Sequence, residues 1–91
     1  MTVISAKLKL YIPHANSLKD KRQVCRSLVD KMRHKFNASI AEVDTQDLCQ
    51  TLTLGVAVVS GDGKHAKQMI KEIVRFAENN IEAELMEVDY E

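Results

Sequence analysis

The chain has 91 residues, enough for one small domain, and its 45% hydrophobic and 29% charged residues are typical of an ordinary soluble fold. Thirteen Lys and Arg balance thirteen Asp and Glu, so the net charge at pH 7 is zero. No run of 18 apolar residues could span a membrane, and Lys7 and Lys9 interrupt the first apolar stretch, which excludes a signal peptide there. We therefore expect a single cytoplasmic domain over residues 1–91.

Hydrophobic periodicity predicts a strand and then a long helix in the first part of the chain. Residues 2–13 alternate between apolar and polar positions, as a half-buried strand does. A helix is expected over residues 17–36, with Ser17 as its N-cap and Asn37 as a left-handed residue beyond its end. Its apolar residues recur at helical spacing and predict a core-facing stripe: Leu18, Cys25, Leu28, Val29, Met32 and Phe36.

Two strands, a helix and a last strand are expected in the remaining chain. The strands over residues 38–44 and 48–60 are separated by a polar break at residues 44–47. Asp62 is the expected cap of the second helix, which ends at Asn79 and Asn80, and the acidic residues 81–90 suit an edge strand. The order βαββαβ predicts a ferredoxin-like α+β fold, a four-stranded antiparallel sheet with strands one and three central and both helices on one face.

Several segments resemble the YlxP-like family of small bacterial proteins. They are residues 14–22 (HANSLKDKR), Phe36-Asn37, residues 41–44 (AEVD), Gln46-Asp47 and residues 55–60 (GVAVVS). The resemblance covers nearly the whole chain and implies a ferredoxin-like fold, in agreement with the pattern. It implies no biochemical activity. Members of this family are often encoded near transcription, translation-initiation and ribosome-maturation factors, which implies RNA or ribosome contact by association.

Basic residues concentrate in the first 36 positions. Residues 1–36 contain nine Lys and Arg against two acids, and residues 37–91 contain four against eleven. Such asymmetry points to nucleic-acid contact, unless the two halves neutralise each other in the fold. The alternative for the first helix is a solvated face on which Arg26 pairs with Asp30. The candidate phosphate-binding residues are Lys19, Lys21, Arg22, Arg26 and Arg33.

An acidic group in the expected hairpin is the counterpart of these bases, namely Glu42, Asp44, Gln46 and Asp47. Their oxygens could bind a divalent cation or act as paired carboxylates, or they could cap the turn and pair with Lys21 or Arg22. No His or Cys stands at metal-ligand spacing, no catalytic triad is evident, and Cys25 and Cys49 are expected to be structural thiols. We therefore expect no metal, no cofactor and no small-molecule substrate, with an enzyme using these carboxylates as a third hypothesis.

The sheet face away from the helices is the second candidate surface. It is expected to expose only one aromatic residue, which does not suit base stacking, whereas its small residues suit contact with another chain. The main hypothesis is a non-enzymatic binding module that contacts structured RNA or a ribosomal particle through the first helix. The alternative is a homo-oligomer, most simply a homodimer, or a protein-interaction domain that uses the open face at Tyr11, Thr53, Gly55, Ala57 and Val59.

Overall fold

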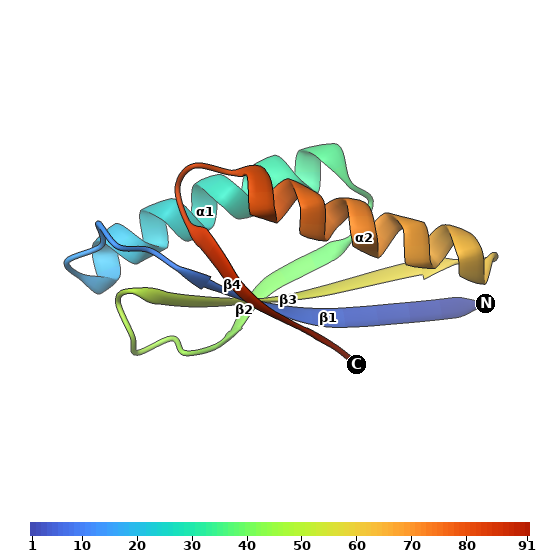
Figure 1. Cartoon of the computed structure of the whole chain (residues 1–91), viewed down its shortest axis with the longest axis horizontal. Helices are drawn as coiled ribbons and strands as arrows, with labels where there is room; N and C mark the ends of the chain where they lie inside the picture. Colours follow the sequence, from blue (N-terminus) through green and yellow to red (C-terminus); the bar gives the residue numbers. More distant parts are fainter.

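The computed structural model describes all 91 residues as a four-stranded sheet covered on one face by two helices (Figure 1). The strands are antiparallel to their neighbours and lie in the order β2-β3-β1-β4, so β1 and β3 are central. The ferredoxin-like fold predicted from the pattern is confirmed. Neither helix is long and apolar enough to cross a membrane. The elements are β1 (Thr2–Tyr11), α1 (Leu18–Lys35), β2 (Ser39–Asp44), β3 (Thr51–Ser60), α2 (Gly63–Asn79) and β4 (Glu84–Tyr90).

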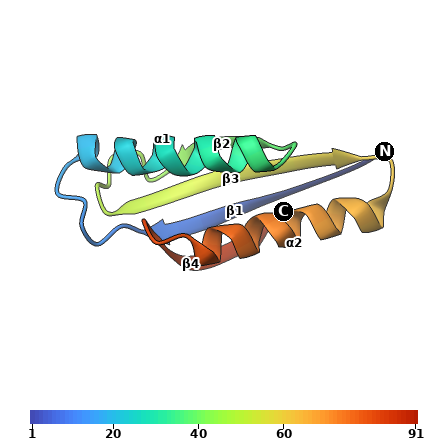
Figure 2. The same ribbon diagram turned by 90° about the horizontal axis from the view of Figure 1, so that it is seen from above.

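The helices lie side by side and run in opposite directions over an elongated molecule of 42 × 21 × 17 Å (Figure 2). Helix α1 covers β2, and α2 covers β1, β3 and β4. The connections at one end of the sheet converge, because Tyr11 at the end of β1 pairs with both Thr51 and Glu84.

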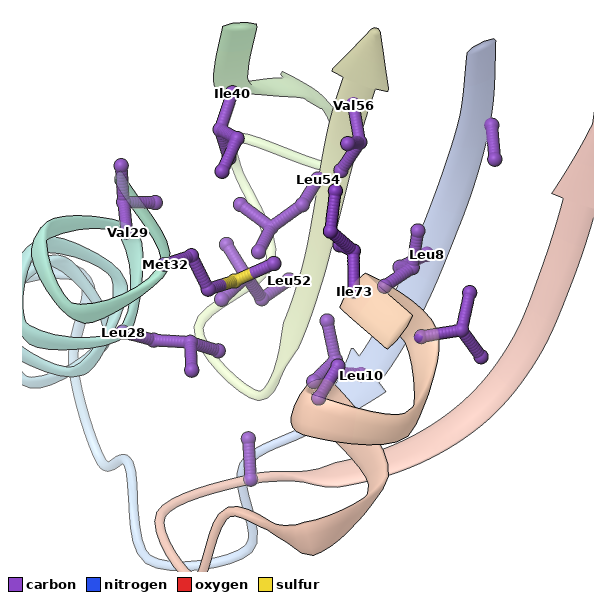
Figure 3. Packing of buried hydrophobic residues seen from close by; sticks show 14 of the residues in the cluster. Leu8, Leu10, Leu28, Val29, Met32, Ile40, Leu52, Leu54, Val56 and Ile73 are labelled. Atoms are coloured by element: carbon purple, nitrogen blue, oxygen red, sulfur yellow. The ribbon is translucent and has the colours of Figure 1, made fainter. Parts of the chain in front are cut away.

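The core fills the space between the sheet and the helices. Figure 3 shows Leu28 and Met32 of α1 directed towards β3, with Ile73 of α2 facing Leu8 and Leu54. Leu28 and Met32 are both 0% exposed, which confirms the predicted apolar stripe at its centre. The central strands contribute alternate residues to the same cluster, and Ile12 just after β1 continues the series: Ala6, Leu8, Leu10, Ile12, Leu52, Leu54, Val56 and Val58.

Both helix starts are capped as the sequence predicts. The Ser17 Oγ accepts a hydrogen bond from the Asp20 N–H at 3.1 Å, and the Asp20 carboxylate accepts one from the Asn16 N–H at 2.9 Å. The Asp62 carboxylate accepts from the Lys64 N–H at 3.0 Å. The predicted left-handed conformation of Asn37 is wrong. Phe36, the C-cap of α1, is extended (φ −122°), and the chain leads straight from it towards β2.

The predicted boundaries of β3 and β4 are also wrong, by three residues each. Before β3, Thr45 adopts a positive φ of 60° and its carbonyl accepts from the Leu48 N–H at 3.0 Å, so a longer loop replaces the short hairpin. Before β4, the Asn80 side-chain oxygen accepts from the N–H groups of Glu82 and Ala83. This turn leaves Ile81 fully exposed, and β4 begins only at Glu84.

Candidate functional site

The charge asymmetry along the sequence becomes, in the fold, an asymmetry between layers. The two helices contain eleven Lys and Arg against four Asp and Glu, a net charge of +7. The strands and loops contain two Lys against nine acids, a net charge of −7. The helices therefore carry a net positive charge, and the rest of the chain carries a net negative charge. The predicted neutralisation of the two sequence halves occurs only for a few cations.

Four of the five predicted contact residues form a row on the outer flank of α1, here called the basic row: Lys19, Arg22, Arg26 and Arg33. Their spacing of three, four and seven residues places them on one side of a helix. All four are exposed and none forms an ion pair, so the Arg26–Asp30 pair of the alternative interpretation is absent. The Arg33 guanidinium donates to the Ile40 carbonyl at 2.6 Å, which orients the row towards β2.

The fifth predicted residue, Lys21, is not part of that surface. Its side chain is 1% exposed and its ammonium lies 3.0 Å from the Glu42 carboxylate. It donates hydrogen bonds to the carbonyls of Thr45 (2.8 Å), Gln46 (3.1 Å) and Thr51 (3.2 Å). The assignment of Lys21 to a nucleic-acid contact is therefore wrong, because a buried ammonium with four partners cannot reach a phosphate. The alternative pairing with the acidic hairpin is the one observed.

The acidic hairpin residues do not converge on one site. Glu42 points to the helix side and pairs with Lys21, whereas Asp44 lies on the opposite face and accepts from Lys7 at 2.8 Å. The Gln46 amide donates to the Val43 carbonyl at 3.1 Å, which stabilises the turn. No group of three or more His, Cys, Asp and Glu is arranged to hold a metal ion. Both cysteines are free thiols.

On the open sheet face, a contact within the sheet itself requires a small residue at Gly55. Gly55 pairs in register with Lys7, and a Cβ at Gly55 would lie 2.8 Å from the Val43 side chain. Because Gly55 has no side chain, the Val43 side chain packs over it. The Lys7 ammonium extends across β3 on the same face and contacts Asp44. Thr53 is 6% exposed and shares a 2.9 Å hydroxyl hydrogen bond with Thr45, so its assignment to an accessible interface is wrong.

The other predicted face residues keep some accessibility. Tyr11 is 38% exposed and Val59 is 58% exposed, whereas Gly55 and Ala57 are half-buried. Other exposed hydrophobic residues were not predicted, among them Val3, which pairs with Val59 across the strands, Val43 on β2 and Met86 on β4.

A groove between the helices was also missed. It is lined by Lys35, Phe36, Glu72, Arg75, Phe76 and Asn79 and has a volume of about 520 Å³. The sequence holds a signal for it, since Lys35-Phe36 and Arg75-Phe76 are two copies of a basic–aromatic dipeptide. Nothing local to either dipeptide shows that the helices bring them together. Both phenylalanines instead fit the core-facing spacing of their helices.

Comparison with known proteins places the chain in a family. Residues 3–90 match the family described as "Protein of unknown function (DUF503)". The chain belongs to this family. It is also similar to the "Uncharacterized protein YlxP" of Bacillus subtilis (strain 168), with 32% identity over 79 residues that cover 87% of this chain and 86% of that protein. The YlxP-like resemblance is thus confirmed. Neither description names an activity, so the function has to be argued from the geometry.

Proposed function

We propose that this member of the DUF503 family is a non-enzymatic binding module that contacts structured RNA, alone or within a ribosomal particle, through its helix layer. The observation that carries the proposal is the basic row on α1. Lys19 and Arg33 are fourteen positions apart, which corresponds to about 21 Å along a helix axis. A row of this length can follow a phosphate backbone, and RNA duplexes are recognised largely by shape and by phosphate and 2′-hydroxyl contacts.

Three cations outside the basic row are neutralised by carboxylates, which supports the choice of this surface. Lys7, Lys21 and Lys31 are each held by a carboxylate, at 2.8, 3.0 and 2.6 Å. None of the basic-row residues has such a partner. The fold therefore neutralises these three cations and leaves the flank of the basic row positive; Lys35 and the cations of α2 also form no ion pair. Binding of a polyanion here would replace the counterions of exposed side chains, without breaking existing ion pairs.

The acidic sheet layer supports one orientation of binding. The helices carry a net charge of +7 and the strands and loops carry −7, so the two parts of the fold differ in sign. In the field of an RNA, the helix layer is attracted and the sheet layer is repelled. This difference in charge would steer the protein so that α1 arrives first, even though the net charge of the chain is zero.

The test is a matched pair of charge reversals. One variant carries Lys19→Glu, Arg22→Glu and Arg26→Glu, and the control carries the same change on α2, at Lys64, Lys67 and Lys71, which are also exposed. Filter binding of a structured ribosomal RNA fragment at low salt should be abolished in the first variant and weakened less in the control. Circular dichroism should show both folded. Absence of binding by the unmodified protein, or equal losses in the two variants, would overturn the proposal.

A second candidate function is self-association through the open sheet face. The pair Val3 and Val59 supports it, since each is 58% exposed. They lie where β1 and β3 extend beyond β2 and β4 as a two-stranded ribbon, so no neighbouring strand covers them. Sedimentation of the unmodified protein and of Ala57→Lys tests this, because a buried unpaired lysine would disrupt such a contact. A monomer in both cases excludes self-association.

A further inference from the structure

The groove between the helices contains a pair of aromatic rings. Phe36 caps the end of α1, and Phe76 lies on the antiparallel helix α2. Their ring centroids are 5.7 Å apart and their planes are inclined by 83°, an edge-to-face arrangement. Both side chains are half-buried, so the rings close the core below and still present surface to the groove above.

Two cations border these rings. The Lys35 ammonium lies 5.8 Å from the Phe36 centroid and 5.2 Å from the Phe76 centroid, within the range of a cation–π contact. Lys35 forms no ion pair and is exposed. Arg75 lines the same groove, together with the Glu72 carboxylate and the Asn79 amide. The groove thus combines aromatic surface, two positive charges, a hydrogen-bond acceptor and an amide.

We propose that this groove binds a single unstacked base of an RNA together with its phosphate. The inference rests on the proposed RNA-binding function and adds what kind of nucleotide is recognised. Aromatic rings stack on any base, which is how proteins hold unpaired nucleotides. A volume of about 520 Å³ falls within the range of small-ligand sites. The Glu72 carboxylate and the Asn79 amide can hydrogen-bond to the edge of the base.

Lys35 has a defined part in this binding mode. A base that stacks on the Phe76 ring, the nearer of the two to the ammonium, takes the position that the ammonium holds and meets the Phe36 ring edge-on. The flexible lysine side chain then moves to the rim of the groove, where its charge meets the phosphate beside Arg75. The cation–π contact is exchanged for a charge-assisted phosphate contact, so the displaced ammonium retains a favourable partner.

The experiment compares two RNA hairpins with the same stem, one fully paired and one with a single bulged nucleotide. The unmodified protein should bind the bulged hairpin about tenfold more tightly, the size of one base–aromatic stacking contact. Phe76→Leu keeps an apolar side chain but removes the ring, and should abolish this preference while leaving affinity for the paired hairpin unchanged. Arg75→Gln should weaken binding to the bulged hairpin more than the matched control Lys71→Gln, which lies one turn away outside the groove.

The outcomes separate this inference from the proposed function. If both hairpins bind equally and Phe76→Leu changes nothing, the groove proposal is overturned, although the basic row can still bind RNA. If neither hairpin binds, the proposed function fails, and titration with adenosine 5′-monophosphate tests the groove directly. Shifts of the Phe36 and Phe76 ring resonances that are lost in Arg75→Gln would support it. Unchanged ring resonances at millimolar nucleotide would overturn it.

Discussion

Lys21 and Glu42 form an ion pair that joins the first turn of α1 to β2, with 3.0 Å between ammonium and carboxylate. The three ammonium protons are directed at the carbonyls of Thr45, Gln46 and Thr51. The Glu42 Oε2 atom therefore acts as a counter-ion and accepts no well-aligned hydrogen bond. Together these contacts fix the loop between β2 and β3 against the helix.

Replacing Lys21 with Met should destabilise the protein strongly. The substitution leaves three carbonyls without their donor and Glu42 without its counter-ion, and breaking one half of a buried ion pair costs about 3–5 kcal/mol. Equilibrium unfolding in urea measures the loss. The control Lys19→Met, at an exposed position two residues earlier, should change the free energy of unfolding by less than about 0.5 kcal/mol. Similar small effects at both positions would contradict the structural role of Lys21.

Replacing Gly55 with Ala should also destabilise the fold, although alanine is normally favoured over glycine in a strand. The new Cβ would lie 2.8 Å from the Val43 side chain, and overpacking of this kind costs about 1–3 kcal/mol. The double variant Gly55→Ala with Val43→Ala should recover part of the loss, as chemical denaturation would show. A stable Gly55→Ala protein would mean that Val43 yields freely and that Gly55 has no packing role.

The helices and the core were predictable because long amphipathic patterns constrain them. The pairing of Lys21 with the acidic hairpin was one of the alternatives, but its burial was not predicted, although at 100° per residue it lies only 20° from the direction of Leu28, within the buried stripe. A lysine there suggests a surface position, since burying an unpaired charge is costly. Its partners lie 21 to 30 residues away, in and beside a loop whose conformation includes Thr45 at positive φ. Local patterns do not contain that information.

The open sheet face also shows that local sequence patterns do not predict contacts between distant residues. Small residues along β3 suggested that another chain packs there, but Gly55 is required by Val43 on the neighbouring strand. The register between β2 and β3 shifts between Glu42 and Asp44. This irregularity places the Val43 side chain over β3. Alternation within one strand predicts which face a residue occupies. It does not predict what a bulge on the next strand places above it.

The ion pair between Lys7 and Asp44 predicts a pH dependence of stability. The hydrogen bond and charge of Asp44, with a smaller contribution from Glu91, raise the pKa of Lys7 above its usual 10.5. Because the pKa is higher in the folded state, the stabilisation is fully present below pH 10.5 and is lost as the pH rises through the folded pKa. The stability difference between the unmodified protein and Lys7→Gln should therefore shrink above pH 10.5. Added salt should reduce it at all pH values, since the pair is exposed.

Cys25 should react slowly with alkylating reagents. Burial raises the pKa of its thiol above the ordinary 9.0, and the nearby Glu42 charge raises it further. The reactive thiolate is therefore scarce at neutral pH. Iodoacetamide should modify Cys25 more slowly in the folded protein than in urea, as peptide mass mapping would show. Glu42→Gln should accelerate the reaction in the folded protein, because it removes the negative charge. A Cys25 that reacts equally fast with and without urea would contradict this.

The salt dependence of RNA binding should reveal how many basic-row residues contact phosphates. Each Lys or Arg that neutralises a phosphate releases counterions, so removing one should lower the slope of log K against log salt by about 1. Lys19→Gln, Arg22→Gln and Arg26→Gln should each do so. Lys9→Gln, at an exposed position on the sheet face, should leave the slope unchanged although it removes the same charge. Equal slope changes in all four variants would show that binding responds to net charge alone, and would remove the basic row as a defined contact surface.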